Sequence, residues 1–515
     1  MALDSPKNTS ETRFTISSHD STGIPGKIQC SEATADLLIE AGKQAWVTPR
    51  EDMVQAKGKG VLATFWLTLN ASTRAASVTS SDKSNSASDQ GVPLKTGVPC
   101  YDDPDAALLK HDRLVEWIAE IFQEHIRKIV AQKGKSHMGP PPDVYLPPAG
   151  KTCLDEVAEV IKLPKFDPKL FAKAHDWQSI ELENIVSTQL HQYIDIIASM
   201  YRSNPFHNFE HACHVTMAVN KLLKRISTPD LDDLKVGDGD GLGEIASHLH
   251  DYTHGINSDQ LTLFAIVFSA LIHDVDHSGV SNGQVIIESK ELAALYKNKS
   301  IAEQNSLDIA WDLLMSTEFT ELRNCLFATQ TELLRFRQVI VNVVLATDIF
   351  DKELNDLRKK RWTKAFSGDE ASTEDFGNLR ATIVIEHIIQ ASDVAHTMQH
   401  WHIYCKWNKR LFLEMYRAFK AGRMAKDPSE FWYQGELGFF DNYIIPLAKK
   451  LKDCNVFGVS SDECLNYAVK NRAEWEARGL EVLGEMMEDV KKMNFDEAWR
   501  TQSRLVLGHS AKHMM

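Results

Sequence analysis

Histidines stand four residues apart in this sequence more often than chance would place them. With 20 histidines among 515 residues, random placement gives roughly one such pair, and side chains four apart share one face of a helix. The sequence contains five pairs at this spacing, His207/His211, His250/His254, His273/His277, His396/His400 and His509/His513. A helix with two imidazoles on one face can present both to a single ion or substrate. We assign no role to the last pair, which lies close to the C-terminal end.

Three segments combine histidines with carboxylates in a way that suits metal binding. They are residues 204–214 (NPFHNFEHACH), 270–282 (ALIHDVDHSGVSN) and 388–401 (IIQASDVAHTMQHW). His273 and Asp274 follow a strongly apolar stretch, and so does Asp393. A charge buried without a partner is costly, so groups in such a position need one, and a divalent metal is a natural partner. Imidazole nitrogen with carboxylate oxygen suits zinc, whereas carboxylates with water suit magnesium.

Each cluster by itself has an alternative explanation. A histidine or an acid at a helix end is often a hydrogen-bonded core or capping group rather than a metal ligand. Three such clusters on one helical domain favour a metal site, although their spacing alone does not establish that they meet in space.

Long helical patterns surround these clusters. Apolar residues recur at three- and four-residue spacing over most of residues 168–495, as in DQLTLFAIVFSALIHD (259–274) and TELLRFRQVIVNVVLATDIF (331–350). Strand patterns are scarce there, so the sequence predicts an all-α domain that is large enough for a sizeable core. A helical stretch at 108–130 precedes it and is followed by residues 136–150, whose five prolines interrupt the pattern.

The predicted fold class is all-α, with a small N-terminal α/β region. We expect a disordered N-terminus at 1–22, the α/β region at 23–69, a Ser-rich linker at 70–104, a helix and Pro-rich connector at 105–150, the helical domain at 151–495 and a C-terminal tail at 496–515. Short strand and helix patterns support the α/β region. The near absence of large apolar side chains supports the linker.

Composition excludes several classes of protein. Acids outnumber bases, 71 to 57, and the formal net charge is −14, so we expect no nucleic-acid partner, which would need a basic footprint. Eight cysteines without a C-x-x-C pair fit reduced thiols in the cytoplasm. The N-terminus has no secretory pattern, and the longest apolar run, residues 261–272, is shorter than the roughly 20 residues that span a bilayer. The sequence therefore predicts a cytoplasmic protein without a membrane segment.

In their order along the chain, the motifs resemble those of the class I 3′,5′-cyclic-nucleotide phosphodiesterases. His-Asn-x-x-His occurs at 207–211, His-Asp-x-Asp-His-x-Gly-x-x-Asn at 273–282, Leu-Ala-Thr-Asp at 345–348, and an isolated acid at Asp393. The resemblance covers roughly residues 150–490, and several motifs in order are more specific than any one of them. It implies an all-helical, HD-type domain with a binuclear metal site at the base of a deep pocket. It also implies hydrolysis of cAMP, cGMP or both to the 5′-monophosphate, which would end a second-messenger signal.

The resemblance implies roles for individual residues. The tighter metal, expected to be zinc, would be held by His211, His273, Asp274 and Asp393. Asp274 would bridge to a second ion, magnesium or manganese. His207 would be the general acid that protonates the leaving O3′, and Glu303 would orient it. His277 and Thr347 would support the attacking hydroxide and the second metal.

The substrate base would bind in a pocket that the family ends with Gln-x-Gly-Phe. Here residues 436–439 read ELGF, so Phe439 would stack on the base, with Leu411 as the opposing apolar side chain. Glu436 replaces the glutamine, and an ionised carboxylate only accepts hydrogen bonds, which would favour the N–H donors of guanine. Gln434, two residues earlier, could take over this part if the turn differs, and a separate alternative is that Glu436 is a solvated charge at the rim. We therefore leave the base unassigned. The predicted substrate-binding set is completed by His396 and Asn282.

A second resemblance lies near the N-terminus. Residues from about 13 to 68 are similar to the C-terminal end of a class III nucleotide cyclase domain. The segment is too short for a complete cyclase core and lacks the upstream metal-binding aspartates. We therefore expect a catalytically empty remnant, which suggests a nucleotide cyclase as a partner. The oligomeric state is left open.

Two alternative functions remain open at this point. One is an HD-type phosphohydrolase that acts on another phosphate ester, and the other is an inactive cyclic-nucleotide-binding regulatory partner of a cyclase. Asn282 together with Phe439 favours a cyclic nucleotide over another ester. The presence of all four expected ligands and of His207 favours an active enzyme over an inactive binder.

Overall fold

The computed structural model describes parts of residues 28–67, and residues 104–133, 142–148, 150–226, 241–366, 374–457 and 461–492. The chain forms two compact units, Met1–Val98 and Pro99–Met515, which are described separately below. The predicted disordered N-terminus, residues 70–103 of the predicted linker, the predicted C-terminal tail and the His509/His513 pair lie outside the described residues.

The described part of the first unit consists mainly of short antiparallel strands. They are β1 (Ile28–Ser31), β2 (Val47–Pro49), β3 (Val54–Ala56), β4 (Gly60–Leu62) and β5 (Thr64–Leu67). The central strand β5 pairs with β1 on one side and with β2 on the other, so that Leu67 lies opposite both Ile28 and Val47. Strands β3 and β4 pair with each other. The Thr-Phe-Trp-Leu sequence of β5 has the β-branched and aromatic residues that favour strands.

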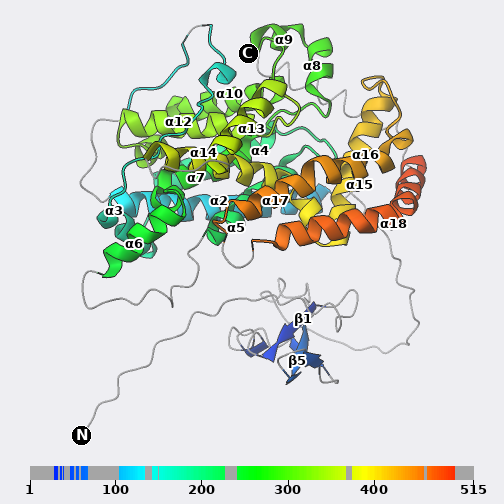
Figure 1. Cartoon of the computed structure of the whole chain (residues 1–515), viewed down its shortest axis with the longest axis horizontal. Coiled ribbons are helices and arrows are strands. Elements are labelled where there is room, and N and C mark those ends of the chain that lie inside the picture. Colours follow the sequence, from blue (N-terminus) through cyan, green and yellow to red (C-terminus); the bar gives the residue numbers. More distant parts are fainter. Residues whose placement is uncertain are drawn as a thin grey trace, which may run out of the picture. The chain divides into compact units, whose positions relative to one another are not determined.

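The described part of the second unit is helical, as the sequence predicts (Figure 1). Its first half contains α2 (Pro104–Lys133), α3 (Pro168–Lys173), α4 (Asn184–Met200), α5 (Phe209–Arg225), α6 (Gly241–Tyr252), α7 (Gln260–Ile272), α8 (Asn282–Glu288), α9 (Lys290–Leu295) and α10 (Ile301–Met315). The second half contains α11 (Thr320–Leu326), α12 (Gln330–Leu345), α13 (Lys352–Phe366), α14 (Glu374–Asp393), α15 (Trp401–Lys420), α16 (Trp432–Phe439), α17 (Ile445–Asp453) and α18 (Glu463–Lys492). No helix among the described residues combines the length and apolarity needed to cross a membrane.

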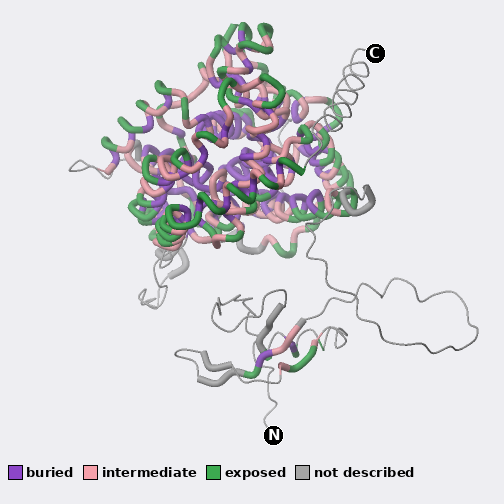
Figure 2. Tube along the Cα trace, turned by 90° about the vertical axis from the view of Figure 1, so that its right-hand side faces the viewer, coloured by how far each residue is buried: buried purple, intermediate pink, exposed green. Residues whose placement is uncertain are grey.

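Helix α7 is the centre of the helical unit. Every residue from Gln260 to Ile272 is buried, and α7 contacts α2, α5 and α12. A helix that is apolar on all sides must be covered on all sides, and Figure 2 shows buried segments running through the interior of this unit. The rings of Phe264 and Phe268 lie 6.0 and 5.3 Å from that of Phe336 on α12. This packing fixes the position of whatever follows the C-terminal end of α7.

Candidate metal and catalytic site

The start of α5 positions the first pair of histidines. Asn208 caps the helix, and its side-chain oxygen accepts a hydrogen bond from the backbone N–H of His211 at 3.1 Å. The amide nitrogen of the same side chain donates to the carbonyl of Asn204 at 2.8 Å. His211 therefore lies in the first turn of α5, where it is 2% exposed, and His207 lies just before the helix.

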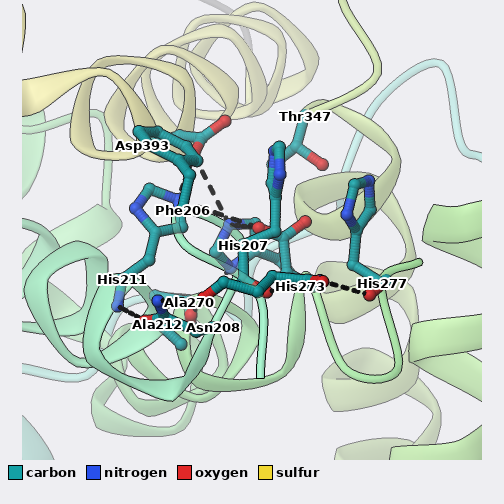
Figure 3. Close-up of polar contacts among 12 residues, drawn as sticks. Phe206, His207, Asn208, His211, Ala212, Ala270, His273, His277, Thr347 and Asp393 are labelled. Atoms are coloured by element: carbon teal, nitrogen blue, oxygen red, sulfur yellow. Dashed lines mark hydrogen bonds and ion pairs between the residues drawn. The ribbon is translucent and has the colours of Figure 1, made fainter. Parts of the chain in front are cut away.

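The ends of α7 and α14 bring further ligand atoms to His211. His273 and Asp274 follow α7 directly, and Asp393 is the last residue of α14. The Nε2 of His211 lies 3.0 Å from Oδ1 of Asp393 and 3.7 Å from Oδ2 of Asp274. The Nε2 of His273 lies 3.4 Å from the same Asp393 oxygen and 3.2 Å from the same Asp274 oxygen. The four residues predicted to hold the tighter metal thus meet in one place, and Figure 3 shows His211, His273 and Asp393 around it.

The donor set at this cluster fits a divalent cation. The Nδ1 of His273 lies 2.9 Å from the carbonyl oxygen of Ala270, so Nδ1–H donates to that oxygen and Nε2 faces the carboxylates. This Nε2 is buried and makes no hydrogen bond of good geometry among the described residues, although two carboxylate oxygens lie 3.2 and 3.4 Å away. Burial opposes ionisation of Asp393, but His211 and His273 hold the pKa of its carboxyl well below the ordinary range. Two imidazole nitrogens facing ionised carboxylates are a typical zinc-binding set.

The histidine pairs do not share helix faces, contrary to the expectation from their spacing. Helix α5 begins two residues after His207, α6 ends before His254, and α7 ends before both His273 and His277. His396 lies in the short turn η7 (Ala395–Met398), and His400 precedes α15. Each described pair thus has at least one member outside a helix. Contacts form instead between segments, as between the rings of His207 and His277, whose centroids are 3.9 Å apart.

Glu414 is the carboxylate that contacts His207, and the expectation that Glu303 does so is wrong. One oxygen of Glu414 pairs with the Nδ1 of His207. Its other oxygen accepts from the backbone N–H groups of Phe206 and His207 at 2.8 and 3.0 Å. Burial lowers the pKa of His207, but the charge of Glu414 outweighs this and raises the pKa to about 9. Glu414 is the one acid in α15 and lies on its buried face, a signal that sequence reasoning could have used.

Glu303 belongs to a different group of polar side chains. Its carboxylate accepts a hydrogen bond from Nδ2 of Asn282 at 3.0 Å, and that nitrogen also lies 3.5 Å from Oδ2 of Asp348. Burial, and next the charge of Asp348, raise the pKa of Glu303 to about 7. Glu303 is thus hydrogen-bonded to Asn282, on α8, and among the described residues it makes no hydrogen bond to the imidazole of His207.

A tight turn holds His277 against His207. The Nδ2 of Asn204 donates to the backbone carbonyls of His207 and His277 at 3.0 and 2.7 Å. Gly279 adopts a left-handed conformation with φ +73°, and a Cβ there would lie 3.2 Å from Oδ1 of Asn204, so glycine keeps this turn closed. Thr347, which donates to the carbonyl of Val344 at 2.8 Å, is drawn together with these histidines in Figure 3. The ligand atoms of His207, His277 and Glu414 lie within 4.8 Å of one another.

Glu436 is buried, so the alternative of a solvated rim charge is wrong. It is 8% exposed and accepts a hydrogen bond from the hydroxyl of Tyr404 at 2.6 Å. Burial raises its pKa to about 7, against the lowering effect of hydrogen bonds from Tyr404 and Asn408. Gln434, by contrast, is exposed.

Three other residues predicted to bind substrate have apolar or aromatic surroundings. Phe439 stacks on Tyr443 with ring centroids 5.4 Å apart, and Leu411 packs partly buried against the core. The imidazole of His396 lies 5.6 Å from the ring of Phe206, and burial lowers its pKa to about 3. A neutral His396 therefore packs behind the histidine cluster, and the part of all these residues in binding stays a prediction.

Comparison with known proteins agrees with this geometry. Residues 206–460 match the family described as 3′5′-cyclic nucleotide phosphodiesterase. The probable 3′,5′-cyclic-AMP phosphodiesterase pde-4 of Caenorhabditis elegans is 25% identical over 367 residues, which are 66% of this chain and 50% of that protein. The cGMP-specific 3′,5′-cGMP phosphodiesterase 3 of Dictyostelium discoideum is 22% identical over 58% of this chain and 57% of its own length. The chain thus spans about half the length of these curated relatives.

A solved structure is also similar. The phosphodiesterase domain of Salpingoeca rosetta rhodopsin phosphodiesterase matches 63% of this chain and 90% of its own, with 20% sequence identity and a TM-score of 0.47.

Proposed function

We propose that this protein hydrolyses 3′,5′-cyclic nucleotides to 5′-monophosphates and so ends a second-messenger signal. The observation that carries the proposal is the convergence of His211, His273 and Asp393 beside a second imidazole, His207, that is paired with Glu414. The first group suits a metal, and the second suits a proton donor. The family match of residues 206–460 supports the same reaction.

We infer that the site holds two divalent cations. His211, His273, Asp274 and Asp393 would hold zinc, and Asp274 would also contact a second ion, magnesium or manganese. When bound, such a pair supplies a Lewis acid and a hydroxide nucleophile at neutral pH. Asp274 faces both His211 and His273 through one oxygen, Oδ2, which is the side where the zinc would bind.

His207 would supply the proton for the leaving O3′. A general acid must be protonated before the reaction, and the Glu414 carboxylate favours the cationic imidazole. Because Glu414 also accepts hydrogen bonds from the backbone of Phe206 and His207, it fixes both the charge and the position of the acid. We propose that His277, packed against the ring of His207, and Thr347 support this side of the site.

Base recognition is proposed for Phe439, Leu411 and Glu436, with Asn282, His396 and Gln434 in the surrounding set. The burial of Glu436 and its bond to Tyr404 fix the carboxyl group. An ionised carboxylate only accepts hydrogen bonds, whereas a protonated carboxyl group can also donate one. Since its pKa is raised to about 7, both forms exist near neutral pH and either purine remains a candidate.

The experiment is steady-state hydrolysis by the full chain of cAMP, cGMP and bis-p-nitrophenyl phosphate, with and without added Mg²⁺ or Mn²⁺. We expect metal-dependent turnover of one or both cyclic nucleotides. Turnover of the non-cyclic ester alone would indicate an HD-type phosphohydrolase. Cyclic-nucleotide binding without turnover in the metal-loaded protein would indicate a regulatory binder.

We further propose that the N-terminal unit is a catalytically empty remnant of a class III cyclase domain. The resemblance of residues 13–68 supports it, and the antiparallel order β1-β5-β2 is compatible with a piece of an α/β domain. A cyclase partner and a cytoplasmic location belong to the same proposal, and the six free cysteines among the described residues are compatible with a reducing compartment. Co-purification of a tagged cyclase with the full chain, but not with a chain that lacks residues 1–98, would support the partnership.

A further inference from the structure

A cavity lies in the helical unit, and none of the residues of the histidine cluster lines it. It has a volume of about 550 Å³, which lies within the roughly 300–1,000 Å³ range of small-molecule sites. Its lining comes from residues 163–166 before α3, from the end of α6 with His254, and from residues 376–380 at the beginning of α14. Helices α3 and α6 contact each other, and Figure 1 shows them side by side.

None of the residues proposed above to bind metal or substrate lines this cavity. The wall formed by residues 163–166 also lies outside the family match, which begins at residue 206. His250 and His254, which have no role in the proposed reaction, line this cavity. Its features therefore need an explanation of their own.

Flat rings line part of the cavity. Phe166 stacks on His250 with ring centroids 4.3 Å apart and an interplanar angle of 24°. Gly255 has φ +81°, and a Cβ there would lie 2.9 Å from Cε1 of His250. The left-handed φ and this close approach both favour glycine at residue 255 in the turn after α6. Phenylalanine, histidine and arginine planes are the surfaces on which proteins stack nucleobases.

The cavity also has cationic groups. The guanidinium of Arg380 lies 4.7 Å from the ring centroid of Phe376, and its Nε donates to the carbonyl of Ala365 at 3.3 Å. Lys165 is an exposed residue of the lining. Within the described ranges neither Arg380 nor Lys165 forms an ion pair with a carboxylate. The lining contains one acidic residue, Asp251. Burial lowers the pKa of His250, and burial followed by Arg380 lowers that of His254 to about 4, so both imidazoles are neutral at pH 7.

We propose that this cavity is a second ligand site that binds a nucleoside monophosphate. Arg380 and Lys165 would bind the phosphate, because a guanidinium forms charge-assisted, often paired hydrogen bonds to phosphate oxygens. The base would lie against the aromatic side chains of Phe166 and His250. Two cationic side chains against one acid make this a locally favourable place for an anion on a chain whose net charge is −14.

The cavity lies away from the proposed metal site. Arg380 and Asp393 lie on the same helix, α14, and 13 residues of helix correspond to about 20 Å. The distance excludes direct contact with the metal ligands. Binding at the cavity and binding at the histidine cluster are therefore separate events that can be measured separately.

The test is a calorimetric titration of the full, metal-loaded chain with 5′-GMP and, separately, 5′-AMP. Because a 5′-monophosphate would also be the product of the proposed reaction, the cavity is identified by variants. Lys165→Glu reverses an exposed charge and should weaken binding of one nucleotide equivalent about tenfold. The matched control is Lys162→Glu, since Lys162 is exposed, three residues away and absent from the lining.

Arg380→Gln should weaken the same binding event at least as much, and KM for the cyclic nucleotide should not change in either lining variant. Circular dichroism checks that Arg380→Gln is folded. The proposal is overturned if Lys165→Glu and Lys162→Glu both bind the two nucleotides as tightly as the parent chain does. It is also overturned if a lining variant loses all nucleotide binding together with cyclic-nucleotide turnover. The chain could also fail to hydrolyse any cyclic nucleotide. Binding of one equivalent of 5′-nucleotide that Lys165→Glu weakens would then still support a ligand site in the cavity. Failure of the proposed reaction and failure of this proposal are therefore distinguishable.

Discussion

Oδ1 of Asp393 lies 3.0 Å from Nε2 of His211, although the two residues are 182 positions apart in the chain. The contact joins the last residue of α14 to the first turn of α5, and α14 packs on α5. His273, at the end of the central helix α7, approaches the same carboxylate oxygen at 3.4 Å. Three helices thus bring one atom each to a common point, and several consequences can be measured.

Replacing Asp393 by asparagine should remove the tightly bound metal and the activity together. Asn keeps the side-chain volume but removes the negative charge that faces His211 and His273. Metal content after dialysis, measured by inductively coupled plasma mass spectrometry, should fall from the parent value to background. The control is Asp356→Asn, whose side chain is 69% exposed. Retained metal with full turnover would reject Asp393 as a ligand.

Replacing His207 by alanine should leave the metals bound while kcat falls roughly 10²–10⁴-fold, the usual contribution of a general acid. His207 lies outside the group formed by His211, His273 and Asp393, so the metal content should not change. The exposed His248 gives a matched control, His248→Ala, with parental kcat. Equal kcat values for the two variants would contradict the assignment.

Glu414→Gln should shift the pH dependence of the reaction. The pKa of His207 is raised by Glu414, so the active cation is present at low pH and is lost as the pH rises through that raised value. Without the charge, burial lowers the pKa, and the alkaline limb of the kcat profile should move to lower pH. KM should change little, because glutamine retains an oxygen that can accept from the backbone of Phe206 and His207.

Glu430→Gln, at an exposed position, should keep the parental profile. An alkaline limb that Glu414→Gln leaves in place would mean that Glu414 has only a structural role.

Glu436→Gln should stabilise the fold at pH 8 and not at pH 4. Burial raises the pKa of Glu436 from 4.5 to about 7, so between these values the folded chain holds a proton that the unfolded chain has released. The free energy of unfolding therefore falls as the pH rises from 4.5 to 7, by about 3 kcal/mol in all. A glutamine cannot ionise, and it keeps an acceptor for the hydroxyl of Tyr404.

Thermal unfolding at both pH values measures this difference. Glu481→Gln, at a side chain that is 64% exposed, should have no pH-dependent effect. A change in Tm for Glu436→Gln that is the same at pH 4 and pH 8 would count against a buried, titrating carboxyl.

The sequence by itself determined the helical class, and it predicted four candidate metal-binding side chains and a candidate proton donor. Helical periodicity is a local property, so an apolar run such as residues 260–272 can be recognised without knowing its neighbours. An acid or histidine at the end of such a run must find a partner once the run is buried. These two arguments identified His273, Asp274 and Asp393 before any distance was known.

Only the tertiary structure decided which of these groups touch. Chain spacing does not reveal that the histidine pairs straddle helix ends, that Glu414 rather than Glu303 contacts His207, or that Glu436 is buried against Tyr404. Each of these contacts joins side chains from different elements, and the packing of whole helices sets their distances. A contact between residues that are far apart in the sequence depends on this packing. It produces no periodic pattern of residue types from which it could be predicted.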